Sequence, residues 1–246
     1  MNWSDEGIVL SARKHGETSA IVTLLTREHG RHAGLVRGGS GSRARGIYQT
    51  GNLLSADWRA RLREHLGTFT CELLRPYAAG LLTERLPLLA LGSAAAVLDR
   101  LLPEREPHPA TFEGFHALVE ALGSDEDWPQ AYVMWEVALL ADLGYGLDLA
   151  QCAATGETED LIYVSPRTGC AVSAGAGSPY RDRLLPLPGF LSDGGAPASE
   201  AEVADGLRLT GHFLARCAKD ADVGELPRAR AQYVDGFRRA MAARIA

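Results

Sequence analysis

Residues 1–80 alternate between short apolar, β-branched runs and polar turns that contain glycine. Five of these runs predict β-strands, at residues 7–13, 20–26, 31–37, 53–63 and 67–73. Five short strands with glycine turns are typical of a small closed barrel such as the OB-fold, and an SH3-like barrel fits the same pattern.

From Tyr77 onward, leucines and alanines follow the longer period of a helix. They predict one long helix that begins at Tyr77 and ends before Pro103. Further helices are predicted at residues 111–122, 129–143, 199–218 and 227–244. The segment 147–198 is rich in Gly, Pro and Ser, and predicts an irregular insertion with one small hairpin around 161–164.

These patterns together predict an α+β protein with two domains. Residues 1–78 form a five-stranded OB-type β-barrel, and residues 79–246 form a helical domain with a loop-rich insertion at about 147–198. The longest mostly apolar stretch, 86–98, is too short to cross a bilayer, and acids stand where a signal peptide would be basic. We therefore expect a cytoplasmic protein without a membrane partner, whose four scattered cysteines are reduced thiols.

The net charge of −6 is an average over two unlike parts. Residues 1–80 carry eleven Lys and Arg against seven Asp and Glu, whereas residues 81–246 carry fourteen against twenty-four. This asymmetry indicates an interaction surface in the basic N-terminal part.

Seven cations of this part are candidate phosphate contacts. Arginine forks match phosphate oxygens, and the glycines of segment 38–46 allow a sugar-phosphate chain to approach the backbone. The candidates are Arg13, Lys14, Arg27, Arg31, Arg37, Arg43 and Arg45. Few aromatic residues are available to stack on bases, namely Tyr48, Trp58 and Phe69, of which Trp58 and Phe69 fit a barrel core better. The pattern predicts salt-sensitive binding with little sequence preference, and its alternative is an ordinary solvated arginine surface.

Other chemistry has little support in the sequence. Gly34 to Gly41 is glycine-rich, but no Gly-Lys-Ser/Thr follows, so a P-loop is excluded. No Cys-x-x-Cys pair indicates a zinc site, and no nucleophile or metalloprotease motif is present. We expect no enzyme activity, no cofactor and no metal, with a reactive Cys170 as the alternative.

Several segments resemble the RecO family of recombination mediators. Residues 6–10 and 15–21 resemble its first two strands, and 26–30 with 36–39 resemble the next strand and its basic loop. Residues 139–149, followed by Cys152, are similar to the family's core helix and its exit, and 165–169 match a later turn. Some members carry a four-cysteine zinc site, but here Cys152 is followed by Thr155, Ser173 and Ala176 at the other three positions, so zinc is not expected.

The resemblance implies a DNA repair and recombination protein. It implies binding of single- and double-stranded DNA, annealing of complementary strands, and help for RecA in replacing single-strand-binding protein (SSB) at the nucleoid. RecR and the acidic C-terminal tail of SSB are the implied protein partners. The alternative is a general single-stranded nucleic-acid-binding or protein-docking OB adaptor with no role in recombination. For a docking groove in the helical part, the candidate rim residues are Arg85, Arg100, Arg228 and Arg230.

Overall fold

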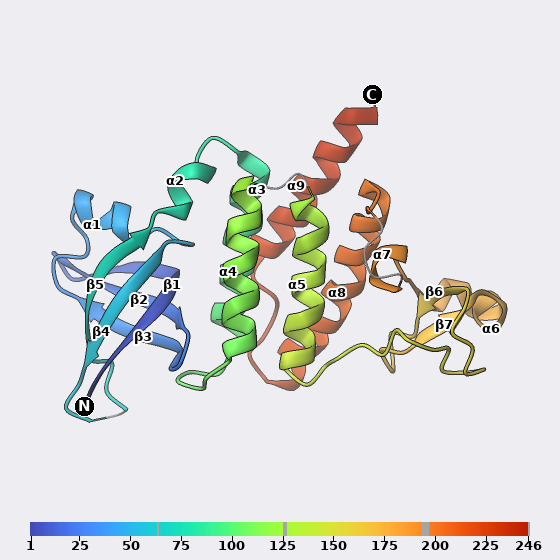
Figure 1. Cartoon of the computed structure of the whole chain (residues 1–246), viewed down its shortest axis with the longest axis horizontal. Helices are drawn as coiled ribbons and strands as arrows, with labels where there is room; N and C mark the ends of the chain where they lie inside the picture. Colours follow the sequence, from blue (N-terminus) through green and yellow to red (C-terminus); the bar gives the residue numbers. More distant parts are fainter. Residues whose placement is uncertain (63, 125–126, 193–196, 246) are drawn as a thin grey trace. The chain divides into compact units, whose positions relative to one another are not determined.

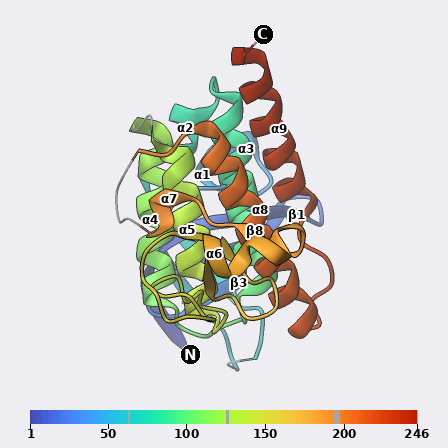
Figure 2. The same cartoon turned by 90° about the vertical axis from the view of Figure 1, so that its right-hand side faces the viewer.

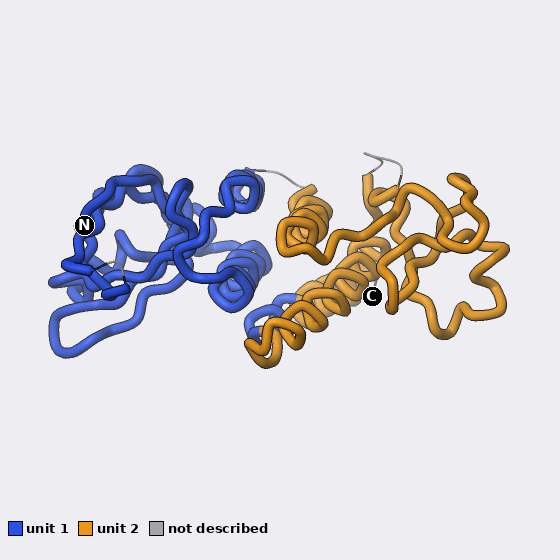
Figure 3. Tube along the Cα trace, turned by 90° about the horizontal axis from the view of Figure 1, so that it is seen from below, with its two compact units in different colours: residues 1–124, 227–233 blue, residues 125–226, 234–246 orange. Residues whose placement is uncertain are grey.

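The computed structural model describes residues 1–62, 64–124, 127–192 and 197–245, which form two compact units (Figure 3). Unit 1 comprises Met1–Ser124 and Pro227–Tyr233, and unit 2 comprises Asp125–Leu226 and Val234–Ala246. No described helix is long and apolar enough to cross a membrane. The predicted α+β class is confirmed, with five N-terminal strands followed by a helical region (Figure 1).

The five strands of unit 1 close into a barrel in the order β1-β2-β3-β5-β4. They are β1 Asn2–His15, β2 Ser19–Thr26, β3 Gly30–Val36, β4 Leu53–Arg59 and β5 Thr68–Arg75. β1 pairs with two strands: its first half with β4 and its second half with β2. Its pairing with β2 shifts register between Val9 and Ser11. A parallel contact of Leu35 with Thr68 joins β3 to β5 and closes the ring. This order and the helix between β3 and β4 agree with the predicted OB-type barrel.

Alternate residues of the strands fill the inside of the barrel, as the period of two requires. Val22, Leu24 and Leu54 are fully buried there, together with Trp58, whose indole N–H donates to the Leu66 carbonyl at 3.0 Å. Gly34 makes room for Phe69, since a Cβ at Gly34 would lie 2.3 Å from the ring.

A short helix that the sequence analysis did not predict, α1 Ser42–Ile47, packs Ala44 and Ile47 against this core. It covers the end of the barrel away from the N-terminus (Figure 1). The buried Asn52 anchors it, donating to the carbonyls of Gly46 and Ile47 at 3.0 Å each and accepting from the Ala78 N–H at 3.1 Å. The basic loop is therefore an ordered part of the barrel.

The rest of unit 1 is helical, with α2 Tyr77–Leu81, α3 Arg85–Leu101 and α4 Pro109–Ser124. The prediction of one long helix from Tyr77 is wrong, because α2 and α3 are separate. Pro87 explains the break. In a continuous helix its ring would clash with the carbonyl four residues earlier, whereas in the first turn of α3 it is tolerated.

Unit 2 is built on two helices, α5 Trp128–Asp142 and α8 Glu200–Asp220, which lie side by side (Figures 1 and 2). Gly206 permits this close approach, since a Cβ there would lie 2.7 Å from Val133. α8 begins with a capping box in which Ser199 and Glu202 satisfy each other's backbone N–H groups. The last helix, α9 Arg228–Ile245, contributes residues to both units.

The predicted insertion contains short elements in unit 2. They are β6 Leu161–Val164, β7 Ala171–Ser173, α6 Ala174–Gly177, the 3-10 helix Ser178–Arg183, β8 Leu185–Pro186 and α7 Gly189–Ser192. The predicted hairpin at 161–164 is present as the β6–β7 pair, which β8 extends to a three-stranded sheet. Residues 193–196 of the predicted insertion lie outside the described residues.

Candidate nucleic-acid interface

The Gly- and Arg-rich segment after β3 is held in place by its own backbone. Gly38 adopts a positive φ of 72°, which turns the chain sharply after Val36. The Ser40 N–H donates to the Thr18 carbonyl, and its hydroxyl to the Glu17 carbonyl, at 3.0 Å each. The β1–β2 turn and the start of α1 are thereby tied together, so the cations on both lie on one end of the barrel.

Two adjoining hollows, which meet at Tyr48, are lined by five cations. The first, of about 640 Å³, is lined by Arg13, Lys14 and Arg45, and the second, of about 410 Å³, by Arg37 and Arg59. Tyr48 lines both hollows, which makes them neighbours. Arg43 is exposed on α1. We call these six cations the α1 surface.

The α1 surface contains very little negative charge. Between Glu28 and Asp57 the chain has no Asp or Glu, and of the described residues that line the first hollow Glu17 is the one acid. Among the described residues, no carboxylate lies within salt-bridge distance of the Lys14, Arg37, Arg43, Arg45 and Arg59 side chains. These cations are therefore available to a polyanion, with only weak competition from the protein itself.

Tyr48 and its partner Cys71 stay neutral beneath this surface. Burial, with the neighbouring Cys71, raises the pKa of Tyr48 to about 12. Burial likewise raises the pKa of Cys71 to about 12. Neither group adds a negative charge below the cations at neutral pH.

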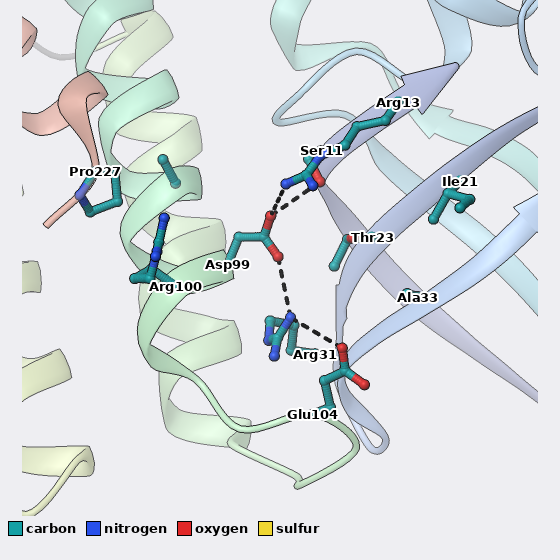
Figure 4. A pocket seen from close by; sticks show the side chains of 11 residues that line it. Ser11, Arg13, Ile21, Thr23, Arg31, Ala33, Asp99, Arg100, Glu104 and Pro227 are labelled. Atoms are coloured by element: carbon teal, nitrogen blue, oxygen red, sulfur yellow. Dashed lines mark hydrogen bonds and ion pairs between the residues drawn. The ribbon is translucent and has the colours of Figure 1, made fainter. Parts of the chain in front are cut away.

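Two of the seven predicted phosphate contacts are occupied by the protein itself. Arg27 pairs with Glu6 at 3.2 Å and with Glu113 of α4, and its guanidinium lies over the Phe112 ring, 4.6 Å from the centroid. Arg31 donates to the Leu102 carbonyl at 2.8 Å and pairs with Asp99 at 3.3 Å and Glu104 at 3.6 Å (Figure 4). Arg27 and Arg31 thus differ from the other five candidates, because these two side chains attach the barrel to α3 and α4.

Arg13 shares features of the unpaired cations of the α1 surface and of the paired arginines, Arg27 and Arg31. Its guanidinium contacts Asp99 at 3.5 Å, yet 79% of its side chain is exposed, and it lines the first hollow of the α1 surface. Ion pairs of this length and exposure contribute little to stability.

The aromatic candidates belong to the core. Tyr48, Trp58 and Phe69 expose 8%, 1% and 4% of their surface, so none offers a free ring face to a base. Sequence reasoning missed Trp3, which stacks on His29 with a centroid distance of 4.1 Å and on Trp58 at 5.7 Å. Trp3 therefore stacks on two neighbouring rings. Because Tyr48 is buried, we expect the α1 surface to act through charge.

The structure gives little support to a metal site or a reactive cysteine. In the part of the chain that it describes, no three His, Cys, Asp or Glu side chains gather as metal ligands would. Cys152 is buried and accepts the Ser173 N–H at 3.3 Å. All four cysteines are free thiols, and Cys170 donates to the Thr168 carbonyl at 3.8 Å, a backbone acceptor that cannot activate it. Of the proposed docking arginines, Arg85, Arg100 and Arg228 are exposed, but Arg230 is buried and cannot rim a groove.

Comparison with known proteins identifies the family. The model of the Recombination protein O N-terminal domain matches residues 1–77, and that of the C-terminal domain matches residues 83–219. The chain belongs to the RecO family. Among relatives named DNA repair protein RecO, that of Rhodospirillum centenum is 55% identical, covering 98% of this chain and 96% of the relative. That of Rhodospirillum rubrum is 48% identical over 99% of each chain, and that of Afipia carboxidovorans 52% over 88% of each.

The two RecO matches follow the structure closely. The N-terminal match ends at Tyr77, the first residue of α2, and so contains the whole barrel and the α1 surface. The C-terminal match runs from the end of α2 almost to the end of α8. The resemblance noted from the sequence is confirmed over nearly the full chain, and with it the assignment to a family of DNA repair proteins.

Proposed function

We propose that this RecO-family chain is a non-enzymatic recombination mediator that binds single- and double-stranded DNA through the α1 surface. In this proposal it anneals complementary strands and, with RecR, helps RecA to replace SSB on single-stranded DNA at the nucleoid in the cytoplasm. The observation that carries the DNA-binding part is the gathering of six cations on α1 and in the two hollows that meet at Tyr48, namely Arg13, Lys14, Arg37, Arg43, Arg45 and Arg59.

Tyr48, the aromatic residue that lines both hollows of the α1 surface, is buried, and this supports binding to the sugar-phosphate backbone. Guanidinium and ammonium groups neutralise phosphates regardless of base, so single and double strands both fit. A backbone-directed site also suits annealing, because the Watson–Crick edges of the bound strand stay free to pair.

The test is DNA affinity as a function of salt for the Arg37→Ala, Arg43→Ala double variant. Each phosphate contact contributes a slope of ~0.7 in log K against log salt for single strands, so losing two lowers the slope by ~1.4. At 0.15 M salt this corresponds to about tenfold weaker binding. The same variant is expected to anneal complementary oligonucleotides more slowly in proportion.

The matched control is the Arg183→Ala, Arg208→Ala double variant, which removes the same charge from exposed positions of unit 2. Unchanged affinity and slope are expected for this control. If the Arg37, Arg43 variant keeps the parental affinity and slope, or if both doubles weaken binding equally, the α1 surface is not the DNA site.

Docking of the acidic SSB tail is proposed on the helical part, with exposed Arg85 and Arg100 as rim residues. Titration of a fluorescent acidic tail peptide against the full chain is expected to saturate, and the Arg85→Ala, Arg100→Ala variant to bind it more weakly. Saturation with undiminished affinity in the variant would exclude these two residues, and no saturation would exclude docking.

A further inference from the structure

A third hollow lies on the outer face of β1, β2 and β3, where α3 crosses the barrel. It measures about 470 Å³, and Thr23 and Ala33 line its floor. Asp99 projects into it from α3 (Figure 4). We call it the Asp99 hollow. The outer face of strands 2 and 3 is where OB-folds bind oligonucleotides.

Three donors converge on the Asp99 carboxylate. One oxygen accepts from the Ser11 hydroxyl at 3.2 Å and from the Arg13 guanidinium at 3.5 Å, and the other accepts from Arg31 at 3.3 Å (Figure 4). Two arginines and a hydroxyl arranged around one pair of anionic oxygens are equally suited to a phosphate, which offers the same kind of acceptors.

Arginines outnumber carboxylates in the lining of the Asp99 hollow. Arg13, Arg31 and Arg100 line it, against the carboxylates of Asp99 and Glu104. It is continuous with the α1 surface, because Arg13 lines both the Asp99 hollow and the first hollow beside α1. A strand bound at the α1 surface that continues past Arg13 therefore reaches the Asp99 hollow.

The contacts of Asp99 differ in how readily they are given up. Arg31 is held by its bond to the Leu102 carbonyl at 2.8 Å, and only 17% of its side chain is exposed. Arg13 has 79% exposure and a long contact, so moving it from Asp99 to another anion costs little. A purely structural ion pair needs neither the empty space beside it nor an exposed second arginine.

From this arrangement we infer that the Asp99 hollow is a backbone-phosphate site, in which Asp99 serves in the free protein as an exchangeable counter-anion that DNA competes with for Arg13. This inference rests on the proposed DNA binding and extends its path along the barrel. It assigns Asp99 the role of lowering DNA affinity.

The decisive variant is Asp99→Asn, which keeps the shape of the side chain and removes its charge. We expect single-stranded oligonucleotides to bind about threefold to tenfold more tightly at 0.15 M salt, with a slope larger by ~0.7, as one released arginine gains a phosphate. Glu120→Gln removes one charge from α4 of the same unit, away from the hollow, and controls for net charge. A gain no larger in Asp99→Asn than in this control overturns the inference.

Arg13→Ala supplies the second arm of the experiment. If Arg13 is the residue that Asp99 withholds, Asp99→Asn must gain less in the Arg13→Ala background than in the parent chain. A full gain without Arg13 overturns the inference. The outcome is distinct from failure of the α1 surface, since that is read from the Arg37, Arg43 variant, in which Asp99 and Arg13 are both intact.

Ser11→Asp tests the same site if Asp99→Asn does not fold. A second carboxylate beside Arg13 is expected to make Ser11→Asp bind DNA about threefold more weakly than Ser11→Asn, which has the same shape without the charge. Equal affinities for these two variants, with melting temperatures showing both to be folded, count against the phosphate site.

Discussion

Arg31 is predicted to stabilise the fold, in contrast to the exposed arginines of the α1 surface. Arg31→Ala removes the hydrogen bond to Leu102, at 2.8 Å, and the ion pairs with Asp99 and Glu104. Breaking a buried ion pair costs about 3–5 kcal/mol, chiefly because one charge is left uncompensated. The Arg31 and Asp99 side chains are each 17% exposed, and Asp99 keeps Arg13 and Ser11 as partners, so we expect a smaller loss, about 2–3 kcal/mol.

The measurement has to isolate the barrel, because the chain has two compact units and tryptophans in both. Hydrogen exchange followed by mass spectrometry on peptides from β3 and the end of α3 reports the local free energy of opening. Arg37→Ala is the comparison, because this side chain is exposed and its loss is expected to change stability by less than ~0.5 kcal/mol. If the β3 amides exchange at the same rate in the two variants, Arg31 does not hold the barrel to α3.

Three further predictions concern the barrel. Burial lowers the pKa of His32 from 6.5 to about 4, so the imidazole takes up a proton at a higher pH in the unfolded chain than in the folded one. The free energy of unfolding is therefore expected to fall by up to about 3 kcal/mol as the pH drops from 6.5 to 4. Denaturation curves measured over this pH range should show a smaller fall for His32→Phe. Gly34→Ala should cost about 1–3 kcal/mol in unfolding free energy through its clash with Phe69, whereas Gly46→Ala, with open space around it, should not destabilise. Arg27→Ala should lower the melting temperature while leaving the salt slope of DNA binding unchanged. A smaller slope would show that Arg27 contacts a phosphate.

The strands were predictable because each carries its own signal. Apolar residues recur with a period of two between glycine turns, and all five predicted strands are present with shifted ends. α1 carries no such signal. It is six residues long, contains glycine and two arginines, and none of its side chains is buried, so its position depends on Asn52 and on the β1–β2 turn. The break before α3 was predictable, since Pro87 stands inside the helix that the leucines suggested.

The sorting of the arginines could not be predicted from sequence. Arg27 pairs with Glu113, 86 residues later in the sequence, and Arg31 pairs with Asp99, 68 residues later. The sequence around each arginine gives no sign of so distant a partner. Direction along β3 separates Arg31 from Arg37. Arg31 lies inside the strand, on the face that meets α3, whereas Arg37 follows the last residue of the strand, where the chain turns toward α1. If β3 ended one residue later, Arg37 would belong to the strand and its side chain would be assigned to a face of the sheet.

An acidic chain is compatible with a DNA-binding site because salt limits how far its charges act. At physiological ionic strength the Debye length is ~8 Å, so a phosphate at the α1 surface responds mainly to the charges immediately around it. Those charges are the six cations, Glu17 and the Asp99 carboxylate beside Arg13, since the chain has no acid between Glu28 and Asp57. Lower salt lengthens the range of the acidic residues after position 80, and they then oppose the approach of DNA. The same argument makes the local neutralisation of Arg13 by Asp99 more influential than the net charge of −6, because it acts at 3.5 Å.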